Sequence, residues 1–192
     1  MEQQGAADHR TRLLQGLTGE VLEVGAGNGM NFRHYPLSVT RVLAVEPEPY
    51  LRRQAQRNAA AAPVPVEVVE GTAGELPVPD RSYDAVVCSL VLCSVPDQRA
   101  ALVDVRRALR PGGELRFFEH VASSSRAAAA VQRALDATIW PHIGGGCHAA
   151  RDTATSIAEA GFEIVELDRF RFPDGPVPTP TAPHILGRAV PA

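Results

Sequence analysis

The sequence has 192 residues, a length that suits one domain with a buried core. With 45% apolar and 21% charged residues, its composition is that of an ordinary globular protein. The formal net charge of −3 argues against nucleic acid as the main partner, because phosphate binding requires a basic surface.

The three cysteines, Cys88, Cys93 and Cys147, do not indicate a disulfide framework. Their number is odd and no signal peptide precedes them, which is typical of a protein from a reducing compartment. The polar N-terminus lacks the apolar core of a secretion signal, and no apolar run reaches the length of a transmembrane helix. We therefore expect a cytoplasmic protein without a membrane anchor.

Taken in chain order, the elements begin with a short amphipathic helix within residues 1–18, followed by apolar strands that alternate with helices. Pro111, Gly112 and Gly113 are expected to end the helix 97–110. The predicted strands are 20–24, 41–45, 66–69, 83–89, 114–119, 162–168 and 185–190, and the predicted helices are 48–62, 97–110, 126–139 and 151–160. This alternation predicts one α/β domain over residues 1–192, with a mostly parallel, seven-stranded sheet flanked by helices.

A glycine-rich turn follows the first predicted strand, in the segment Val21-Leu22-Glu23-Val24-Gly25-Ala26-Gly27-Asn28-Gly29, and is expected to open a helix. Glycines there let the backbone turn tightly and lie close to a ligand, which in an open α/β sheet binds beyond the carboxyl ends of the strands. Met30 stands where the dinucleotide fingerprint has its third glycine, so the pattern is G-x-G-x-G and disfavours a nicotinamide cofactor.

Glu46 ends the second predicted strand, about twenty residues after the glycines, where a carboxylate can accept hydrogen bonds from both hydroxyls of a ribose. An acid at a strand end is equally often a helix cap, so Glu46 indicates a cofactor site only in combination with the glycine turn. Three further segments follow at regular spacing: 71–77 after the third strand, 84–87 in the fourth, and 109–113 before the fifth.

In this order and spacing, these motifs resemble the class I S-adenosylmethionine (SAM)-dependent methyltransferases, from about Glu20 to the C-terminus. The resemblance implies the Rossmann-like class I methyltransferase fold, SAM as the cofactor, and Glu23 at its methionine end. Thr72 stands where many relatives carry Asp against the adenine amine, so only the backbone of that loop is expected to contribute. The implied cofactor-binding residues are Glu23, Gly25, Ala26, Gly27, Asn31, Glu46, Pro47, Thr72, Ala73, Ser89 and Leu90.

A second set of motifs resembles the animal alkyl-thiol methyltransferases and their bacterial relatives. These motifs are residues 31–36, 87–95 and 119–121, Gly146-Cys147 followed by Arg151, and residues 183–185 with Gly187. The resemblance implies methylation of a small, apolar thiol or dithiol, for detoxification or self-protection. The animal enzymes carry an N-terminal hydrophobic anchor that is absent from this sequence, so their membrane location is not implied.

A thiol acceptor must lose its proton, because the thiolate is the nucleophile. His120, just past the carboxyl end of the fifth strand, is the first candidate base, followed by His148 and His184. Each of the three is at least as often a hydrogen-bonded structural histidine. Glu119 and His120 are consecutive on a strand and point to opposite faces, so only one of them can reach the acceptor if the strand is regular.

Residues 120–150 and 170–184 are expected to cover the acceptor site. Within the first of these segments, Val131, Leu135, Ile139 and Trp140 form either an apolar wall of the pocket or the packing of one helix. At Cys93, an apolar filler is a commoner role than a redox-sensitive residue. His142, Cys147 and His148 do not have the spacing of a standard zinc motif, so no metal site is expected.

Other functions stay open at this point. A quinone-precursor C-methyltransferase, or another small-molecule O- or N-methyltransferase, would share the cofactor site but would need a different acceptor pocket. A protein that binds SAM without catalysis would also keep Glu23, Gly25, Gly27 and Glu46.

Overall fold

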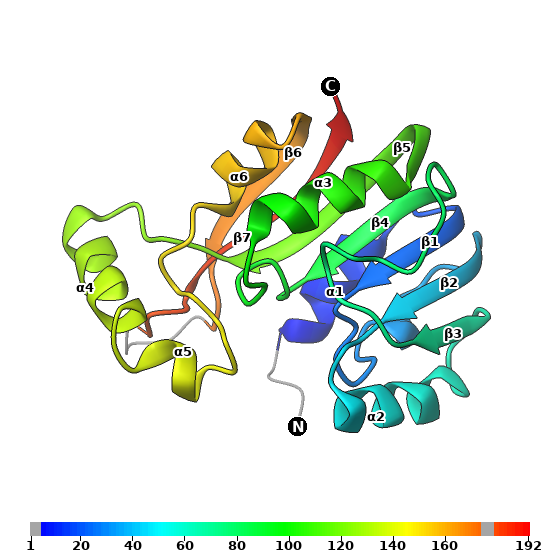
Figure 1. The fold of residues 1–192 in the computed structure, drawn as a ribbon, viewed down its shortest axis with the longest axis horizontal. Coiled ribbons are helices and arrows are strands. Elements are labelled where there is room, and N and C mark those ends of the chain that lie inside the picture. Colours follow the sequence, from blue (N-terminus) through cyan, green and yellow to red (C-terminus); the bar gives the residue numbers. More distant parts are fainter. Residues whose placement is uncertain (1–4, 174–178) are drawn as a thin grey trace.

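Seven strands form one mixed sheet in the order β3-β2-β1-β4-β5-β7-β6, in a computed structural model that describes residues 5–173 and 179–192 (Figure 1). Strand β7 runs antiparallel to both of its neighbours, and the other neighbouring pairs are parallel. The strands are β1 (Gly19–Val24), β2 (Val39–Val45), β3 (Val66–Val69), β4 (Tyr83–Ser89), β5 (Leu109–His120), β6 (Phe162–Arg171) and β7 (Pro183–Pro191). The predicted Rossmann-like fold, with its mostly parallel seven-stranded sheet, is confirmed.

Helices cover both faces of this sheet, with α3 and α6 in front and α1 behind in Figure 1. The helices are α1 (Ala6–Leu14), the 3₁₀ turn η1 (Phe32–His34), α2 (Pro49–Ala59), α3 (Gln98–Ala108), α4 (Arg126–Asp136), α5 (Trp140–Ile143) and α6 (Thr153–Glu159). Two apolar clusters result, because successive side chains of a strand point to opposite faces. In β1, Val21 packs in the cluster that contains Leu13 of α1, whereas Leu22 packs in the cluster that contains Leu102 of α3.

Three predictions about where helices begin or end were wrong. The glycine turn does not open an α-helix, because only the short turn η1 and a few residues separate Gly29 from the start of β2. The segment Pro111 to Gly113 does not end a helix, because α3 already ends at Ala108 and β5 begins at Leu109, opposite Tyr83. The predicted helix 126–139 is α4, which ends three residues earlier, at Asp136, and the short α5 begins only at Trp140.

The carboxyl ends of β1 to β5 lie along one edge of the sheet, as the strand register shows. The facing pairs at this edge are Val24 with Val45 and Cys88, Val45 with Val69, and Ser89 with Phe118. The residues that follow these positions, among them Gly25, Glu46 and Leu90, are therefore neighbours in space. In Figure 1, α4 and α5 lie beyond the end at which β5 finishes.

Candidate active site

The glycine turn after β1 requires glycine because of its backbone conformation and, at two positions, because a side chain would collide with a neighbour. Gly25, Gly27 and Gly29 all have positive φ, between 58° and 81°, which side chains rarely adopt. A Cβ at Gly25 would lie 2.2 Å from a methyl group of Val91, and one at Gly29 would lie 2.5 Å from the ring of Phe32. A Cβ at Gly27 would meet no atom within 4 Å. Space therefore lies open over Gly27, as a bound ligand requires.

Glu46 is buried at the end of β2, with its carboxylate beside this turn. Its Oε2 accepts a hydrogen bond from the backbone N–H of Gly27 at 2.7 Å, and its Oε1 accepts one from the N–H of Glu48 at 2.9 Å. Each carboxylate oxygen has a further lone pair, so Glu46 can still accept from a ribose. Arg52, which was not predicted from the sequence, donates hydrogen bonds through Nη1 to the carbonyl oxygens of Glu46 and Pro47, at 2.9 and 2.8 Å.

Glu23 is fully enclosed in a polar chain beneath the turn. Asn31 Nδ2 donates to one carboxylate oxygen at 2.9 Å, and the hydroxyl of Tyr35 donates to the other at 2.7 Å. Arg10 in turn donates to Asn31 Oδ1 at 2.6 Å. Burial raises the pKa of Glu23 to about 7, although the hydrogen bonds from Tyr35 and Asn31 oppose that rise. Glu23 thus ties α1 and residues 31–35 to the end of β1.

The turn after β4 combines a strained backbone at Leu90 with the buried hydroxyl of Ser89. Leu90 has φ of 57°, a conformation that a branched side chain rarely adopts, and its side chain is 37% exposed. The hydroxyl of Ser89 is buried and has no hydrogen-bond partner within the part of the chain that the structure describes. Strain and an unpaired hydroxyl at a strand end are typical of a ligand site.

Glu119 fixes the backbone that follows Leu90, a role that the sequence did not predict. Its buried carboxylate accepts hydrogen bonds from the backbone N–H groups of Val91, Leu92 and Cys93 at 3.0, 3.0 and 3.2 Å. Burial raises the pKa of Glu119, and these N–H groups oppose the rise. The end of β5 is thereby locked to the turn after β4.

The loop after β3 and the residue after Glu46 are more open to solvent. Thr72 and Pro47 are exposed, and Ala73 is half-buried. Thr72 bridges to Glu75 through its backbone, with the Glu75 N–H donating to the Thr72 carbonyl at 3.2 Å. The role of Thr72, Ala73 and Pro47 in cofactor binding stays a prediction.

His120, the last residue of β5, lies in a buried cluster with two cysteines. Its Nε2 is 3.1 Å from Cys147 Sγ, and its Nδ1 has no hydrogen-bond partner among residues 5–173 and 179–192. Cys147 also accepts from Trp140 Nε1 at 3.3 Å. Contact with the Cys93 thiol, together with His120 and Trp140, lowers the pKa of Cys147, whereas the same contact and burial raise the pKa of Cys93.

The other two candidate histidines lie outside this cluster. His148 is partly exposed, and its Nδ1 lies 4.0 Å from an oxygen of Asp136. His184 packs in an aromatic group with Phe118 and Phe170, and its ring meets that of His120 edge-on at 5.9 Å. Burial lowers the pKa of His184 to about 4, so its ring is neutral at pH 7. This surrounding is typical of a packing residue.

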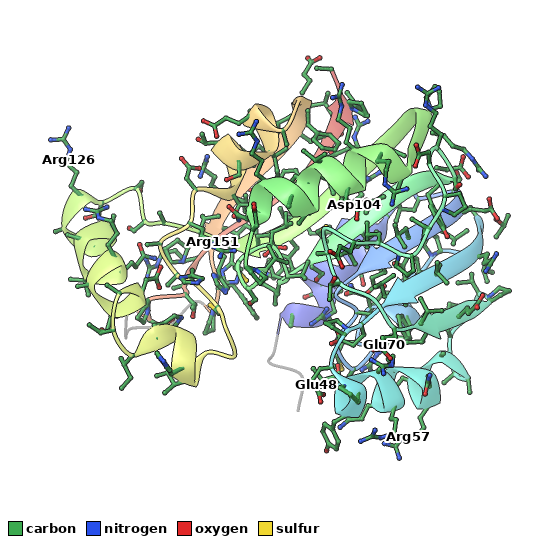
Figure 2. All side chains as sticks on the ribbon, in the orientation of Figure 1. Glu48, Arg57, Glu70, Asp104, Arg126 and Arg151 are labelled. Carbon is green, nitrogen blue, oxygen red and sulfur yellow. The ribbon has the colours of Figure 1, made fainter. Side chains whose placement is uncertain are left out.

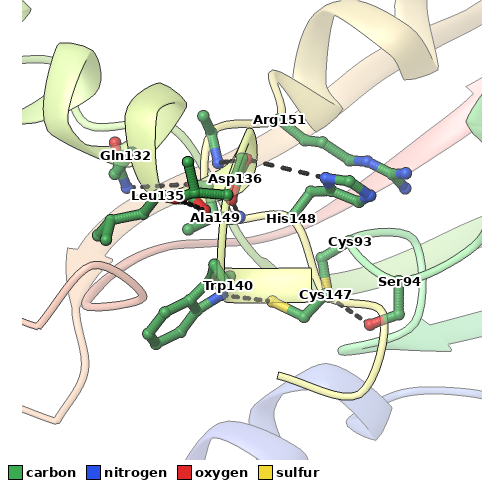
Figure 3. A network of polar contacts seen from close by, with 12 residues as sticks. Cys93, Ser94, Gln132, Leu135, Asp136, Trp140, Cys147, His148, Ala149 and Arg151 are labelled. Atoms are coloured by element: carbon green, nitrogen blue, oxygen red, sulfur yellow. Dashed lines mark hydrogen bonds and ion pairs between the residues drawn. The ribbon is translucent and has the colours of Figure 1, made fainter. Parts of the chain in front are cut away.

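Residues 147–151 are hydrogen-bonded to the turn after β4. The N–H of His148 donates to the Cys93 carbonyl at 2.9 Å, and Arg151 Nη1 donates to the Leu92 carbonyl at 2.6 Å. Figure 3 shows Cys147 beside Trp140, and Cys93 facing them from another segment. In Figure 2, Arg151 lies among the side chains between α4 and the sheet, whereas Arg126 projects away from the molecule.

Polar contacts attach α4 to this region. Asp136 accepts from the N–H groups of Ala149 and Ala150, and the amide of Gln132 donates to the carbonyl oxygen of Val121. Val131 and Ile139 are 58% and 55% exposed, so these two are not buried in the packing of a helix. Leu135 and Trp140 are half-buried, and their role in a pocket wall stays a prediction. Residues 120–150 are described throughout, while residues 170–184 include 174–178, which lie outside the described residues. No helix among the described residues is long and apolar enough to span a membrane.

Comparison with known proteins gives the family of this chain. A methyltransferase domain model matches residues 22–117. Thiol S-methyltransferase TMT1B of Mus musculus is 41% identical over 186 residues, covering 92% of this chain and 73% of the relative. Thiol S-methyltransferase TMT1A of Homo sapiens is 37% identical over 174 residues, covering 88% and 70%. A solved S-adenosylmethionine-dependent methyltransferase from Mesorhizobium loti has a TM-score of 0.70 at 20% identity, covering 96% of this chain and 98% of that one.

Proposed function

Since the chain belongs to the methyltransferase domain family, we propose that it transfers the methyl group of its cofactor, SAM, to the sulfur of a small apolar thiol. The observation that carries this proposal is the extent of the similarity to thiol S-methyltransferases. It covers 92% of the chain, so it includes acceptor-side residues beyond position 117, where the general methyltransferase match ends.

The residues along the carboxyl edge of the sheet fit SAM. The space over Gly27 is open, the carboxylate of Glu46 has lone pairs to spare, and the hydroxyl of Ser89 is buried without a partner in the described residues. We expect Glu46 to accept from the ribose, because of its position after β2. The turn at Leu90 would lie between cofactor and acceptor.

When bound, SAM supplies an electrophilic methyl group on a sulfonium, and its departure as a neutral thioether needs no acid. The work left to the chain is to align the acceptor sulfur with that methyl group and to exclude water. The turn at 90–93, held by Glu119 and Arg151, is a rigid support for this alignment.

The acceptor must also be ionised, because a thiolate is a far better nucleophile than a thiol. We assign this task to the cluster of Cys93, His120 and Cys147, with His120 as its central residue. Cys93 is itself the last residue of the turn at 90–93, and the buried side chains of His120 and Cys147 contact each other beside it. His184, which is neutral and stacked, and His148, which faces Asp136, are weaker candidates.

An acceptor screen with methyl-labelled SAM tests the proposal. Thiols, amines, phenols and quinols of similar size are offered in parallel, and the labelled products are identified by mass spectrometry. We expect methyl thioethers from apolar thiols and little transfer to the other acceptors. Transfer to quinols and not to thiols would instead favour a quinone-precursor C-methyltransferase.

A further inference from the structure

Three potential metal ligands from separate parts of the chain meet at the end of β5. The Sγ atoms of Cys93 and Cys147 and a ring nitrogen of His120 all lie within 4.8 Å of one another. Cys93 follows β4, His120 ends β5, and Cys147 follows α5. All three residues are buried, with exposed fractions of 1%, 8% and 7%. Their burial sets them apart from the exposed acidic clusters that are common on protein surfaces.

The three donor atoms favour particular metal ions. Two sulfur atoms and one imidazole suit zinc and similar soft divalent ions, and two cysteines with one histidine form a known set of three ligands at catalytic zinc sites. The group includes no fourth ligand from the described residues, and the nearby carboxylate of Glu119 is occupied by three backbone N–H groups. An ion held by these three side chains would therefore keep one coordination position open.

We propose that Cys93, His120 and Cys147 bind a zinc-like divalent ion, and that the acceptor thiol occupies its open coordination position. The thiol part of this inference rests on the proposed function. The ion then ionises the acceptor, and His120 contributes as a ligand through Nε2. Nδ1 carries the ring proton in that state, so His120 does not itself remove the acceptor's proton.

Surrounding contacts hold the ligands in place before an ion arrives. The backbone of Cys93 is fixed on both sides, by its N–H to Glu119 Oε2 at 3.2 Å and by its carbonyl to the N–H of His148 at 2.9 Å. Trp140 Nε1 donates to Cys147 Sγ, as partners of metal-bound thiolates do (Figure 3). Preorganised ligands and second contacts of this kind raise metal affinity.

The site is also near the expected position of the transferred methyl group. Val91, two residues before Cys93, is the residue that a Cβ at Gly25 would strike. On binding, the acceptor thiol releases its proton to solvent and its sulfur becomes a metal-bound thiolate. That sulfur forms the new bond to the methyl carbon, while the bond from this carbon to the sulfonium sulfur breaks and its electron pair stays on the departing sulfur. The methylated product is a neutral thioether, a weaker ligand that can leave.

Cobalt(II) titration of the reduced, full-length chain tests the site without any need for turnover. We expect one equivalent to give a thiolate-to-cobalt charge-transfer band together with the visible bands of a four-coordinate ion. Cys93→Ser, Cys147→Ser and His120→Asn should each weaken binding by about 10-fold or more, because one of three protein ligands is lost. Cys88→Ala and His142→Asn are matched controls, since Cys88 lies in β4 and His142 is exposed, and both should bind cobalt normally.

A second measurement covers the case in which a variant fails to fold. Zinc should protect Cys93 and Cys147 of the unmodified chain from alkylation, as read by mass spectrometry, and should not change the labelling of Cys88. Absence of the charge-transfer band, unchanged labelling with zinc, or a Cys93–Cys147 disulfide in place of metal uptake would each overturn the proposal.

Addition of an apolar thiol separates this inference from the proposed function. A thiol should shift the charge-transfer band, whereas its methyl thioether should not. Thiol methylation by a chain that binds no cobalt would leave the proposed function standing and remove the metal site. A cobalt site in a chain that methylates no thiol would leave the metal site standing and remove the proposed function.

Discussion

Glu119 and His120, consecutive residues at the end of β5, contact different segments and thereby join them. Glu119 accepts from three backbone N–H groups of the turn after β4, and His120 contacts Cys147 in the segment after α5. The alternation of a strand separates the two side chains, as expected from sequence. The first residue fixes the backbone of the turn at 90–93, and the second lies in the cluster of Cys93, His120 and Cys147.

His120→Ala should lower turnover of a weakly acidic thiol by about 10²-fold or more, the scale for loss of a group that assists proton removal. SAM affinity should change little, because the ring would contact the acceptor and not the cofactor. The loss should shrink for thiols of low pKa, which are already ionised. Steady-state kinetics with a series of acceptors measure this loss of turnover. His142→Ala, at an exposed position, is the control. Equal losses across the series would mean that His120 only maintains the shape of the site.

Glu46→Ala should weaken SAM binding by about 1.5–3 kcal/mol, because charge-assisted hydrogen bonds to the ribose are lost. Titration calorimetry gives the change directly. Glu67→Ala, at an exposed position of the neighbouring strand β3, serves as the control and should bind SAM like the unmodified chain. If Glu46→Ala also binds normally, the ribose does not contact this carboxylate.

Gly27→Val should abolish SAM binding while the fold is retained, since its side chain enters open space and collides with nothing. Its positive φ of 58° adds backbone strain, so the free energy of unfolding should fall somewhat. Gly25→Ala should lose more unfolding free energy, because its Cβ would also collide with Val91. Circular dichroism, thermal unfolding and SAM titration of both variants separate the two effects. Normal binding by Gly27→Val would place the cofactor elsewhere.

Glu23 should make stability depend on pH. Its folded-state pKa of about 7 lies above the ordinary value of 4.5, so the folded chain binds more protons between these pH values. The contribution of Glu23 to stability is fully present below pH 4.5 and is lost as the pH rises through about 7. Relative to Glu23→Gln, the unmodified chain should therefore lose about 2–3 kcal/mol of unfolding free energy over this range.

Urea unfolding at a series of pH values measures this difference. Glu163→Gln, at an exposed position of β6, should follow the unmodified chain at each pH. A constant difference between Glu23→Gln and the unmodified chain would mean that the pKa of Glu23 is not raised.

Apolar runs were enough to predict the central strands β1 and β4, because strands covered on both faces have few polar residues to interrupt the pattern. The segments 66–69 and 83–89 have the bounds of β3 and β4. The helix expected after the glycine turn is absent because the connection to β2 is too short, a constraint that local pattern does not include. The carboxyl-edge position of Gly25 and Glu46 followed from strand order alone.

The reactive cluster was not predictable from spacing. His120 and Cys147 are 27 positions apart, and they meet because residues 147–151 are hydrogen-bonded to the turn after β4. The residues close together in the sequence are His142, Cys147 and His148, but His142 is exposed and His148 faces Asp136. Long-range contacts of this kind require the folded backbone.

The most direct test of the central claim compares three acceptors with one carbon skeleton, an apolar thiol and the matching alcohol and amine. Each is incubated with the unmodified chain and methyl-labelled SAM, and kcat/KM is measured with the product identified by mass spectrometry. The account predicts a labelled methyl thioether, with kcat/KM for the thiol at least about 10²-fold above those of the alcohol and amine. Equal or faster methylation of the alcohol or the amine would contradict it.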